Sequence, residues 1–277
     1  MPAKNLCDGA VLVLQRGTPE HKTSLTHALV AAWRNGIIPL GEGPAPPVRP
    51  SRPVRPELRL PRDMPKRRAA GSAASRVALL HALAHIELNA LDLAWDLIAR
   101  FGNTDRPREF YDDWLRVADE EATHHRLLSE RLAAYGAAYG DLPAHDGLWQ
   151  AAEATAHDLL ARLAIVPLVL EARGLDVTPV MIASLEKAGD VESAAVLKVI
   201  YRDEITHVAI GRRWFDAICA ERGLAPEPAY QDLVRRHFRG RLKPPFNAAA
   251  REAAGLPAAF YEVLAEGEGA PAAGSGC

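Results

Sequence analysis

Two short motifs in this 277-residue chain each place a glutamate three residues before a histidine. They are Glu121/His124 and Glu204/His207. In a helix this spacing brings both side chains to one face, about a turn apart. The chain's ten histidines and 35 acidic residues would give roughly 1.3 such pairs by chance, so the motif alone identifies nothing. Whether the two pairs form a functional site must be judged from the residues around them.

Two further glutamates lie inside apolar runs. Glu87 is flanked by apolar residues in Leu83–Leu91, and Glu171 follows six apolar residues in a row. A carboxylate in such surroundings is costly unless it is paired or bound to a cation. Glu87 comes 34 residues before Glu121, and Glu171 comes 33 residues before Glu204. The sequence therefore predicts two helical hairpins, each with a glutamate on its first helix and a Glu-x-x-His motif on its second.

Six side chains are thus predicted to form one metal site. A glutamate from each of two helices and Glu-x-x-His from each of the other two is the ligand arrangement of ferritin-like dimetal carboxylate proteins. Four carboxylates balance the charge of two divalent ions. Oxygen and imidazole donors suit iron or manganese, so we expect two metal ions, iron first and manganese as the alternative. The predicted ligands are Glu87, Glu121, His124, Glu171, Glu204 and His207.

Side chains near these positions are candidates for supporting roles. Tyr201 lies three residues before Glu204 and shares its helix face, so it is a candidate catalytic residue that could hydrogen-bond a ligand; a core tyrosine is the alternative. Asp203, Glu120 and Asp119 are candidate acceptors for imidazole N–H groups, which would fix a ligand's tautomer. A salt-bridge role is the alternative for all three acids.

The elements that must position these residues are helices, and no alternating strand pattern appears. Four long helices with short connections predict an all-α, ferritin-like four-helix bundle. The third long helix contains Pro167 as an expected kink and ends at Gly174, and Pro179 opens a short helix after it. The long helices are predicted at 72–101, 107–135, 148–173 and 190–222, with shorter ones at 18–35, 178–188 and 228–238, and an apolar stretch follows at 257–264.

Four parts of the chain are expected. Residues 1–71 hold an N-terminal helix and a strap rich in Pro and Arg, 72–222 form the bundle, 223–265 are a C-terminal helical extension, and 266–277 are a disordered tail. In the strap, prolines recur every third residue from 47 to 56, with Arg49, Arg52 and Arg55 in phase. This is the period of polyproline II. We expect the strap to lie over its own domain, with docking on a partner's groove as the alternative.

Composition narrows the classes of function. A net charge of −2 and a pI near 6.6 give no reason to expect a polyanion-binding surface. The three cysteines lie far apart, as free thiols in a reducing compartment would. The N-terminus has no apolar stretch of signal-peptide length, and no run reaches the ~18 apolar residues of a membrane span. We expect a soluble, cytoplasmic protein without a membrane partner.

Several stretches carry a family resemblance. They are His85-Ile-Glu87, Tyr139–Trp149, Glu171–Asp176 and Asp203–Val208. On these residues most of the chain resembles the ferritin-like superfamily, and within it a bacterial family described only as a domain of unknown function. The resemblance implies a dimetal bundle but no substrate. More distant relatives include a di-iron tRNA hydroxylase and rubrerythrin-like peroxidases.

The function expected from this site is a di-iron oxygenase or oxidase-type oxidoreductase that activates O2 or peroxide. Its organic substrate, a small molecule or tRNA, is not identified by the sequence; the electron donor is expected to be separate, and a homo-oligomer is compatible with the sequence. A manganese catalase or peroxidase would use the same ligands, and a metal-free helical interaction scaffold is the third hypothesis. The absence of a CxxC pair argues against a rubrerythrin proper, and the strap argues against a ferritin cage.

Overall fold

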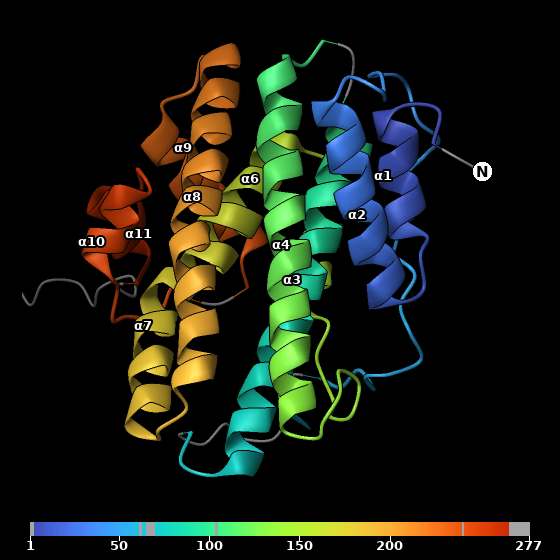
Figure 1. Ribbon diagram of the computed structural model, residues 1–277. Coiled ribbons are helices and arrows are strands. Elements are labelled where there is room, and N and C mark those ends of the chain that lie inside the picture. The colour runs from blue at the N-terminus through green and yellow to red at the C-terminus, as the bar shows by residue number, and fades with distance from the viewer. Residues whose placement is uncertain (1–2, 61–62, 65–69, 103–104, 240, 266–277) are drawn as a thin grey trace, which may run out of the picture. The chain divides into compact units, whose positions relative to one another are not determined.

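A computed structural model describes residues 3–60, 63–64, 70–102, 105–239 and 241–265, and their regular structure is helical (Figure 1). One isolated bridge, between Leu58 and Ala144, is the extended pairing found among these residues. The predicted all-α class is confirmed. The helices are α1 Leu6–Leu14, α2 Pro19–Arg34, α3 Ala73–Phe101, α4 Arg108–Ala134, α5 Gly147–Ala154, α6 Leu159–Ile165, the π-helical segment η2 Val166–Glu171, α7 Ala172–Lys187, α8 Val191–Glu221, α9 Pro226–His237, α10 Ala248–Ala253 and α11 Ala258–Ala265.

Capping residues explain where the well-predicted helices begin and end. The Thr18 hydroxyl accepts a hydrogen bond from the His21 amide at the start of α2, and Pro19 takes the first helical position. Ser72 forms a capping box with Ser75 at the start of α3. Gly223, which follows α8, has a φ of +64°, a left-handed conformation that favours glycine after a helix.

The prediction of a single helix over 148–173 is wrong. Helix α5 ends at Ala154 and α6 begins only at Leu159. The Thr155 hydroxyl donates to the Ala151 carbonyl at 2.9 Å, so a side chain satisfies the last turn of α5. Pro167, expected to kink the helix, lies in the π-helical segment η2.

The predicted helix end at Gly174 and new start at Pro179 are also wrong, because α7 contains both residues. Gly174 does not have the positive φ of a helix cap. The next turn is held by tertiary contacts, since Leu175 is buried and Asp176 pairs with the buried Arg251. Packing has overridden the local signal for a helix end.

The chain divides into two compact units. Unit 1 comprises Met1–Leu159 and Val177–Asp203, and unit 2 comprises Leu160–Asp176 and Glu204–Cys277. Helices α7 and α8 each contribute residues to both units. The division of the chain at 72 and 223 stays a prediction, and its proposed tail, 266–277, lies outside the described residues.

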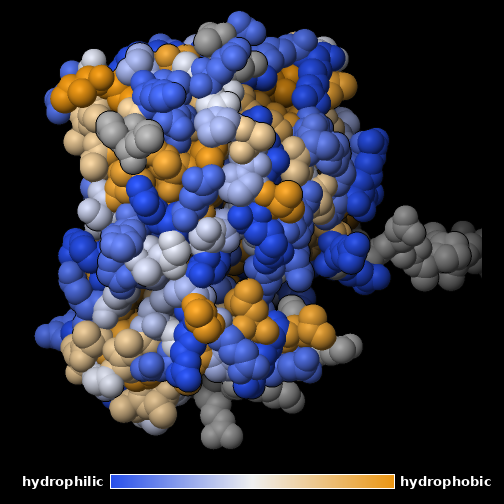
Figure 2. All heavy atoms as spheres, turned by 90° about the vertical axis from the view of Figure 1, so that its right-hand side faces the viewer, coloured by the Kyte–Doolittle hydropathy of each residue, from blue (hydrophilic) through white to orange (hydrophobic). Residues whose placement is uncertain are grey.

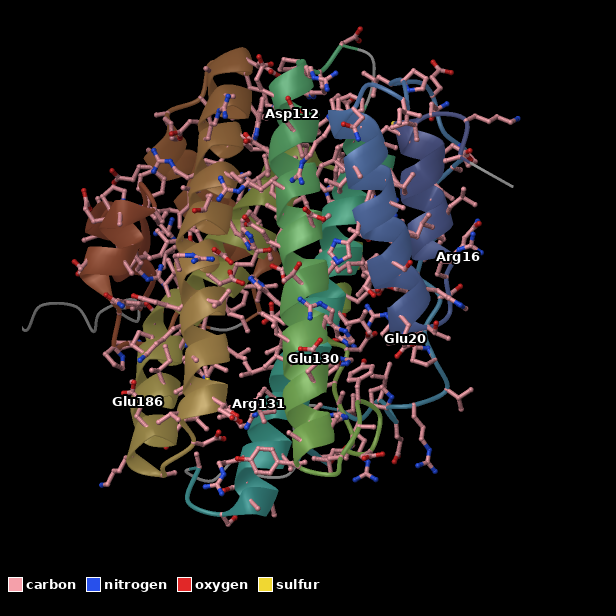
Figure 3. The ribbon with its side chains drawn as sticks, in the orientation of Figure 1. Arg16, Glu20, Asp112, Glu130, Arg131 and Glu186 are labelled. Carbon is pink, nitrogen blue, oxygen red and sulfur yellow. The ribbon has the colours of Figure 1, made fainter. Side chains whose placement is uncertain are left out.

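In unit 1, α3 runs along α4, and α1 and α2 lie beside this pair (Figure 1). Trp33 of α2 donates its indole N–H to Asp112, near the N-terminal end of α4 (Figure 3), at 2.6 Å. Near the other end of α4, Arg131 pairs with Asp190 before α8 at 3.3 Å. An apolar cluster joins α3, α4 and the unit 1 parts of α7 and α8; its members include Leu80, Leu83, Leu128, Leu132, Ile182, Leu185, Leu197 and Ile200.

The described part of the Pro/Arg-rich strap lies over unit 1, as expected. Arg49 pairs with Asp146 and, at 2.7 Å, with Glu153 of α5. Arg52 reaches α3, where its Nη2 lies 2.8 Å from the Asn89 Oδ1 and 2.9 Å from the Asp92 Oδ2. Arg49 and Arg52 of the strap therefore bind residues of their own unit.

Unit 2 fastens the C-terminal extension to the start of α7. Arg251 of α10 and Asp176 of α7 form a buried pair with Nη2–Oδ2 at 2.7 Å and Nε–Oδ1 at 2.8 Å. The Arg251 guanidinium also lies 4.4 Å from the ring centroid of Tyr261 on α11. The Tyr230 hydroxyl of α9 donates to the Leu168 carbonyl in η2 at 3.1 Å.

Among the described helices, α3 is long and apolar enough to cross a membrane, but 72% of its most apolar 18-residue window is buried. Burial of this kind is typical of the core helix of a soluble protein. The face turned to the viewer in Figure 2 is largely hydrophilic, with hydrophobic groups scattered over it. The burial of α3 is thus consistent with a soluble protein.

Candidate metal centre

Three of the predicted ligands meet inside unit 1. Glu87 comes from α3, and Glu121 and His124 come from consecutive turns of α4. The His124 Nδ1 lies 3.2 Å from the Glu87 Oε2 and 3.6 Å from the Glu121 Oε2. All three residues are buried, and a ligand atom from each lies within 4.8 Å of the others. They form a buried Glu/His group, called the first triad below, that could hold a metal ion.

The electrostatics of the first triad favour a cation. Burial and, after it, the neighbouring carboxylate of Glu121 raise the pKa of Glu87 to about 8. Burial lowers the pKa of His124, but hydrogen bonds to Asp203, Glu121 and Glu87 outweigh it and raise the pKa well above its usual value. Two buried carboxylates facing one imidazole therefore bind protons strongly. A divalent ion at the same place would offset the repulsion between the two carboxylates.

The outer nitrogen of His124 has its own acceptor in unit 1. Its Nε2 lies 3.2 Å from the Oδ2 of Asp203 on α8. If the hydrogen sits on Nε2, Nδ1 turns its lone pair toward Glu87 and Glu121, where a metal ion would bind. Asp203 thus occupies the place of a residue that fixes the tautomer of a ligand histidine.

The other three predicted ligands lie in unit 2 and are called the second triad. Glu204 and His207 occupy consecutive turns of α8, with the His207 Nδ1 3.8 Å from the Glu204 Oε1. Both are buried. Glu171 is half-buried and is the last residue of η2, immediately before α7. Each unit therefore carries one of the two lone glutamates of the predicted ligand set and one of the two Glu-x-x-His motifs.

The remaining predicted site residues have different surroundings. The Asp119 carboxylate lies 2.7 Å from the His27 Nδ1 and 3.1 Å from the Arg34 Nη1, both on α2. Glu120 pairs with Arg116 one turn earlier at 3.0 Å. Tyr201 is half-buried and packs against the apolar cluster of unit 1. Of the three predicted acidic neighbours, Asp203 contacts His124.

A cluster of neutral histidines around Tyr139 was not expected from the sequence. The His85 Nδ1 lies 2.9 Å from the Tyr139 hydroxyl, and its Nε2 lies 3.1 Å from the His145 carbonyl. Burial lowers the pKa of His85 to about 3 and that of His125 to about 4. His81 accepts a hydrogen bond from the Gly140 amide at 2.9 Å. The Tyr139–Trp149 stretch stood out in the sequence as part of the family resemblance. No local pattern in it predicts that this loop packs on α3.

A second buried polar group joins the strap to α2 and α3. Lys22 of α2 forms an ion pair with Asp92 of α3, and both side chains are fully buried. Burial lowers the pKa of Lys22, an effect that Asp92 opposes. Arg52 from the strap binds the other oxygen of Asp92. This group fixes three elements of unit 1 and has no donor set typical of a metal site.

The donors of the two triads are of one chemical kind. Carboxylate oxygens and imidazole nitrogens suit iron, manganese or zinc, and no thiolate belongs to either triad. Cys7 and Cys219 are free and buried. The residues therefore fit a hard or borderline divalent metal.

Comparisons with known proteins place the chain in a family without supplying an activity. The family model described as "Protein of unknown function (DUF455)" matches residues 15–262. A protein of Haemophilus influenzae (strain ATCC 51907 / DSM 11121 / KW20 / Rd), described as an uncharacterized protein, is 44% identical over 209 residues, which are 74% of this chain and 72% of that protein. No solved structure was found to match. Neither match names an activity, so we infer the function from the side chains.

Proposed function

Since the chain belongs to the DUF455 family, described as proteins of unknown function, we propose that it is a dimetal-carboxylate oxidoreductase that activates O2 or peroxide on an organic substrate. The fold proposed for it is a ferritin-like four-helix bundle. Cys7 and Cys219, which are free and buried, suit a reducing cytoplasm. The proposal names iron as the metal and a separate molecule as the electron donor.

The first triad is the observation that carries this proposal. Two glutamates and a histidine from two different helices are buried with contacts of 3.2 and 3.6 Å, and an acidic residue supports the far nitrogen of the histidine. Burial of such a group without a cation is costly. The second triad repeats its composition in unit 2. The two triads supply the six ligands proposed for two metal ions.

The proposed roles follow from the chemistry of the donors. Two metal ions held by these donors would supply Lewis acidity and electrons for reaction with O2 or peroxide. Glu87 and Glu121 provide oxygen donors, and His124 offers Nδ1 while Asp203 holds Nε2. Glu171, Glu204 and His207 would do the same for the second ion. Tyr201, three residues before Glu204 on α8, is proposed to hydrogen-bond the substrate or the oxidant.

The contacts of the strap weigh against the metal-free scaffold. That hypothesis needs an exposed arginine row to bind a partner. Arg49 and Arg52 instead form ion pairs with acidic residues of unit 1. The scaffold hypothesis also gives no reason for the burial of two carboxylates and an imidazole in the first triad.

Metal loading tests the proposal directly. The protein is purified without metal and supplied with Fe(II) under anaerobic conditions, and bound iron is counted by mass spectrometry. We expect two irons per chain, and Mössbauer spectra after exposure to O2 or peroxide should show a spin-coupled pair. Absence of stoichiometric iron and manganese overturns the proposal.

Two variants of α4 separate a specific site from general binding. Glu121→Gln should lose at least one metal ion per chain, because it removes a charged ligand. Glu130→Gln is the matched control, since Glu130 lies on the same helix but pairs at the surface with Arg126. A manganese-loaded protein that rapidly disproportionates peroxide would instead favour a catalase.

A further inference from the structure

Gly211 of α8 faces Pro167 of η2 so closely that a side chain at position 211 would clash with the proline. A Cβ atom built on Gly211 would lie 2.3 Å from the Pro167 Cβ and 2.5 Å from its Cγ. Both residues belong to unit 2. Gly211 is a helical residue without a positive φ, so the requirement is for space and not for backbone freedom. The Pro167 ring of η2 thus packs against α8 at Gly211, where a side chain is missing.

This contact lies on the ligand-bearing face of α8. Gly211 follows His207 by four residues and Glu204 by seven, a spacing that keeps all three on one helix face. Pro167 lies four residues before Glu171, about one turn away. The two segments that carry the second triad are therefore pressed together about one turn from their ligands.

The π-helical winding of η2 separates Pro167 from Glu171. Pro167 has no N–H to continue an α-helix, and its carbonyl accepts a hydrogen bond from the Ala172 amide five residues later. The extra residue in this π-helical turn changes the direction of the side chains that follow it, beginning with Glu171. The Tyr230 hydroxyl holds the same turn through the Leu168 carbonyl. Such π-helical turns occur often at functional sites.

We propose that Gly211 is a positioning residue of the second triad: its close contact with Pro167 sets the position of Glu171 relative to Glu204 and His207. This inference rests on the proposed metal site. It assigns a role in metal binding to a residue that has no ligand atom. A side chain at 211 would push η2 away from α8 and move Glu171 with it.

The test compares Gly211→Ala with Gly174→Ala. Gly174 is also a helical glycine of unit 2, but a Cβ there would meet nothing within 4 Å. Metal-free protein is titrated with Co(II), followed by visible absorption, and the bound metal is counted. Wild type and G174A should bind two ions alike. G211A should keep one ion and bind the other at least tenfold more weakly, with an altered absorption spectrum.

A second-site change checks that the effect is steric. Pro167→Gly removes the ring and the Cβ that would meet Ala at 211, so it should restore part of the second metal affinity in the G211A background. Pro167→Ala keeps the Cβ and should not. If G211A does not fold, Tyr230→Phe replaces it, because it removes only the hydroxyl that holds the Leu168 carbonyl. It should weaken the same metal ion less strongly.

The outcomes separate the two proposals. Wild-type protein that binds no metal overturns the proposed function and the positioning role with it. Two ions in wild type and two in G211A, with equal affinity and equal spectra, overturn the positioning role alone. Loss of both ions in G211A at an unchanged melting temperature also overturns it, because the effect would not be confined to the second triad.

Discussion

The Asp203 Oδ2 lies 3.2 Å from the His124 Nε2, a contact that joins α8 to α4 within unit 1. Arg202 binds the same carboxylate, with its Nε 2.9 Å from Oδ1. Burial raises the pKa of Asp203, but the hydrogen bonds to His124 and Arg202 outweigh it and bring the pKa to about 2. Asp203 is therefore an anion at neutral pH and holds the ring with Nδ1 toward Glu87.

Asp203→Asn should weaken metal binding without removing a ligand. Loss of an acceptor that orients a ligand histidine typically costs about 10- to 100-fold in metal affinity. Competition with a chelator of known affinity measures the change. Asp119→Asn is the control, because Asp119 bonds His27 and Arg34 and should leave the affinity unchanged. Equal affinities for D203N and wild type would contradict the role given to Asp203.

The metal-free protein should lose stability as pH rises. The pKa of Glu87 is raised from 4.5 to about 8 in the fold, so the folded state keeps a proton that the unfolded state has released. This contribution is complete below pH 4.5 and is lost as pH rises through 8. The raised pKa of His124 acts in the same direction above pH 6.5.

Melting temperatures measured in chelator across this pH window check the sign. They should fall from the acidic to the alkaline end, and Glu87→Gln should flatten the slope because it carries no titrating carboxyl group. Metal added at the alkaline end should restore stability. A melting temperature that rises with pH over the window would rule out this account of the first triad.

Local signals predicted most of the helices. Thr18 and Ser72 mark helix starts and Gly223 a helix end, because caps depend on neighbouring residues alone. The helix end predicted at Gly174 and the start predicted at Pro179 were wrong, because tertiary contacts stabilise α7 in this region. Asp176 pairs with Arg251 of α10, and Leu175 is buried. The short helix α1 was missed although Asn5 caps it through the Asp8 amide.

The candidate site, like the helices, could be predicted from the sequence only in part. The Glu-x-x-His geometry follows from helix spacing, so it could be read from the sequence. The contact between Glu87 and His124 needs α3 to pack on α4 in one register, which the hairpin spacing only suggested. The π-helical turn before Glu171 and the space reserved at Gly211 depend on packing within unit 2 and had no local signal.

Arg52→Ala should loosen the strap and lower stability. Its guanidinium binds Asn89 and Asp92, and hydrogen bonds to charged groups are worth about 1.5–3 kcal/mol. Urea unfolding measures the loss, and limited proteolysis within the strap should become faster. Arg59→Ala is the control, because the Arg59 guanidinium pairs at the surface with the exposed Glu57. Strap cleavage no faster in R52A than in R59A would refute the anchoring role.

Asp176→Ala should destabilise unit 2 far more than Asp216→Ala. The Asp176–Arg251 pair is buried on both sides, and removing one partner of such a pair costs about 3–5 kcal/mol because the other charge stays buried. The Asp216–Arg212 pair has nearly the same N–O distance, 2.9 Å, but Asp216 is 40% exposed, so its loss should cost about 0.3–0.5 kcal/mol. Urea unfolding of both variants gives the comparison. Similar losses would mean that burial does not set the strength of this pair, and that the C-terminal extension is held mainly by the packing of Phe246 and Tyr261 around Arg251.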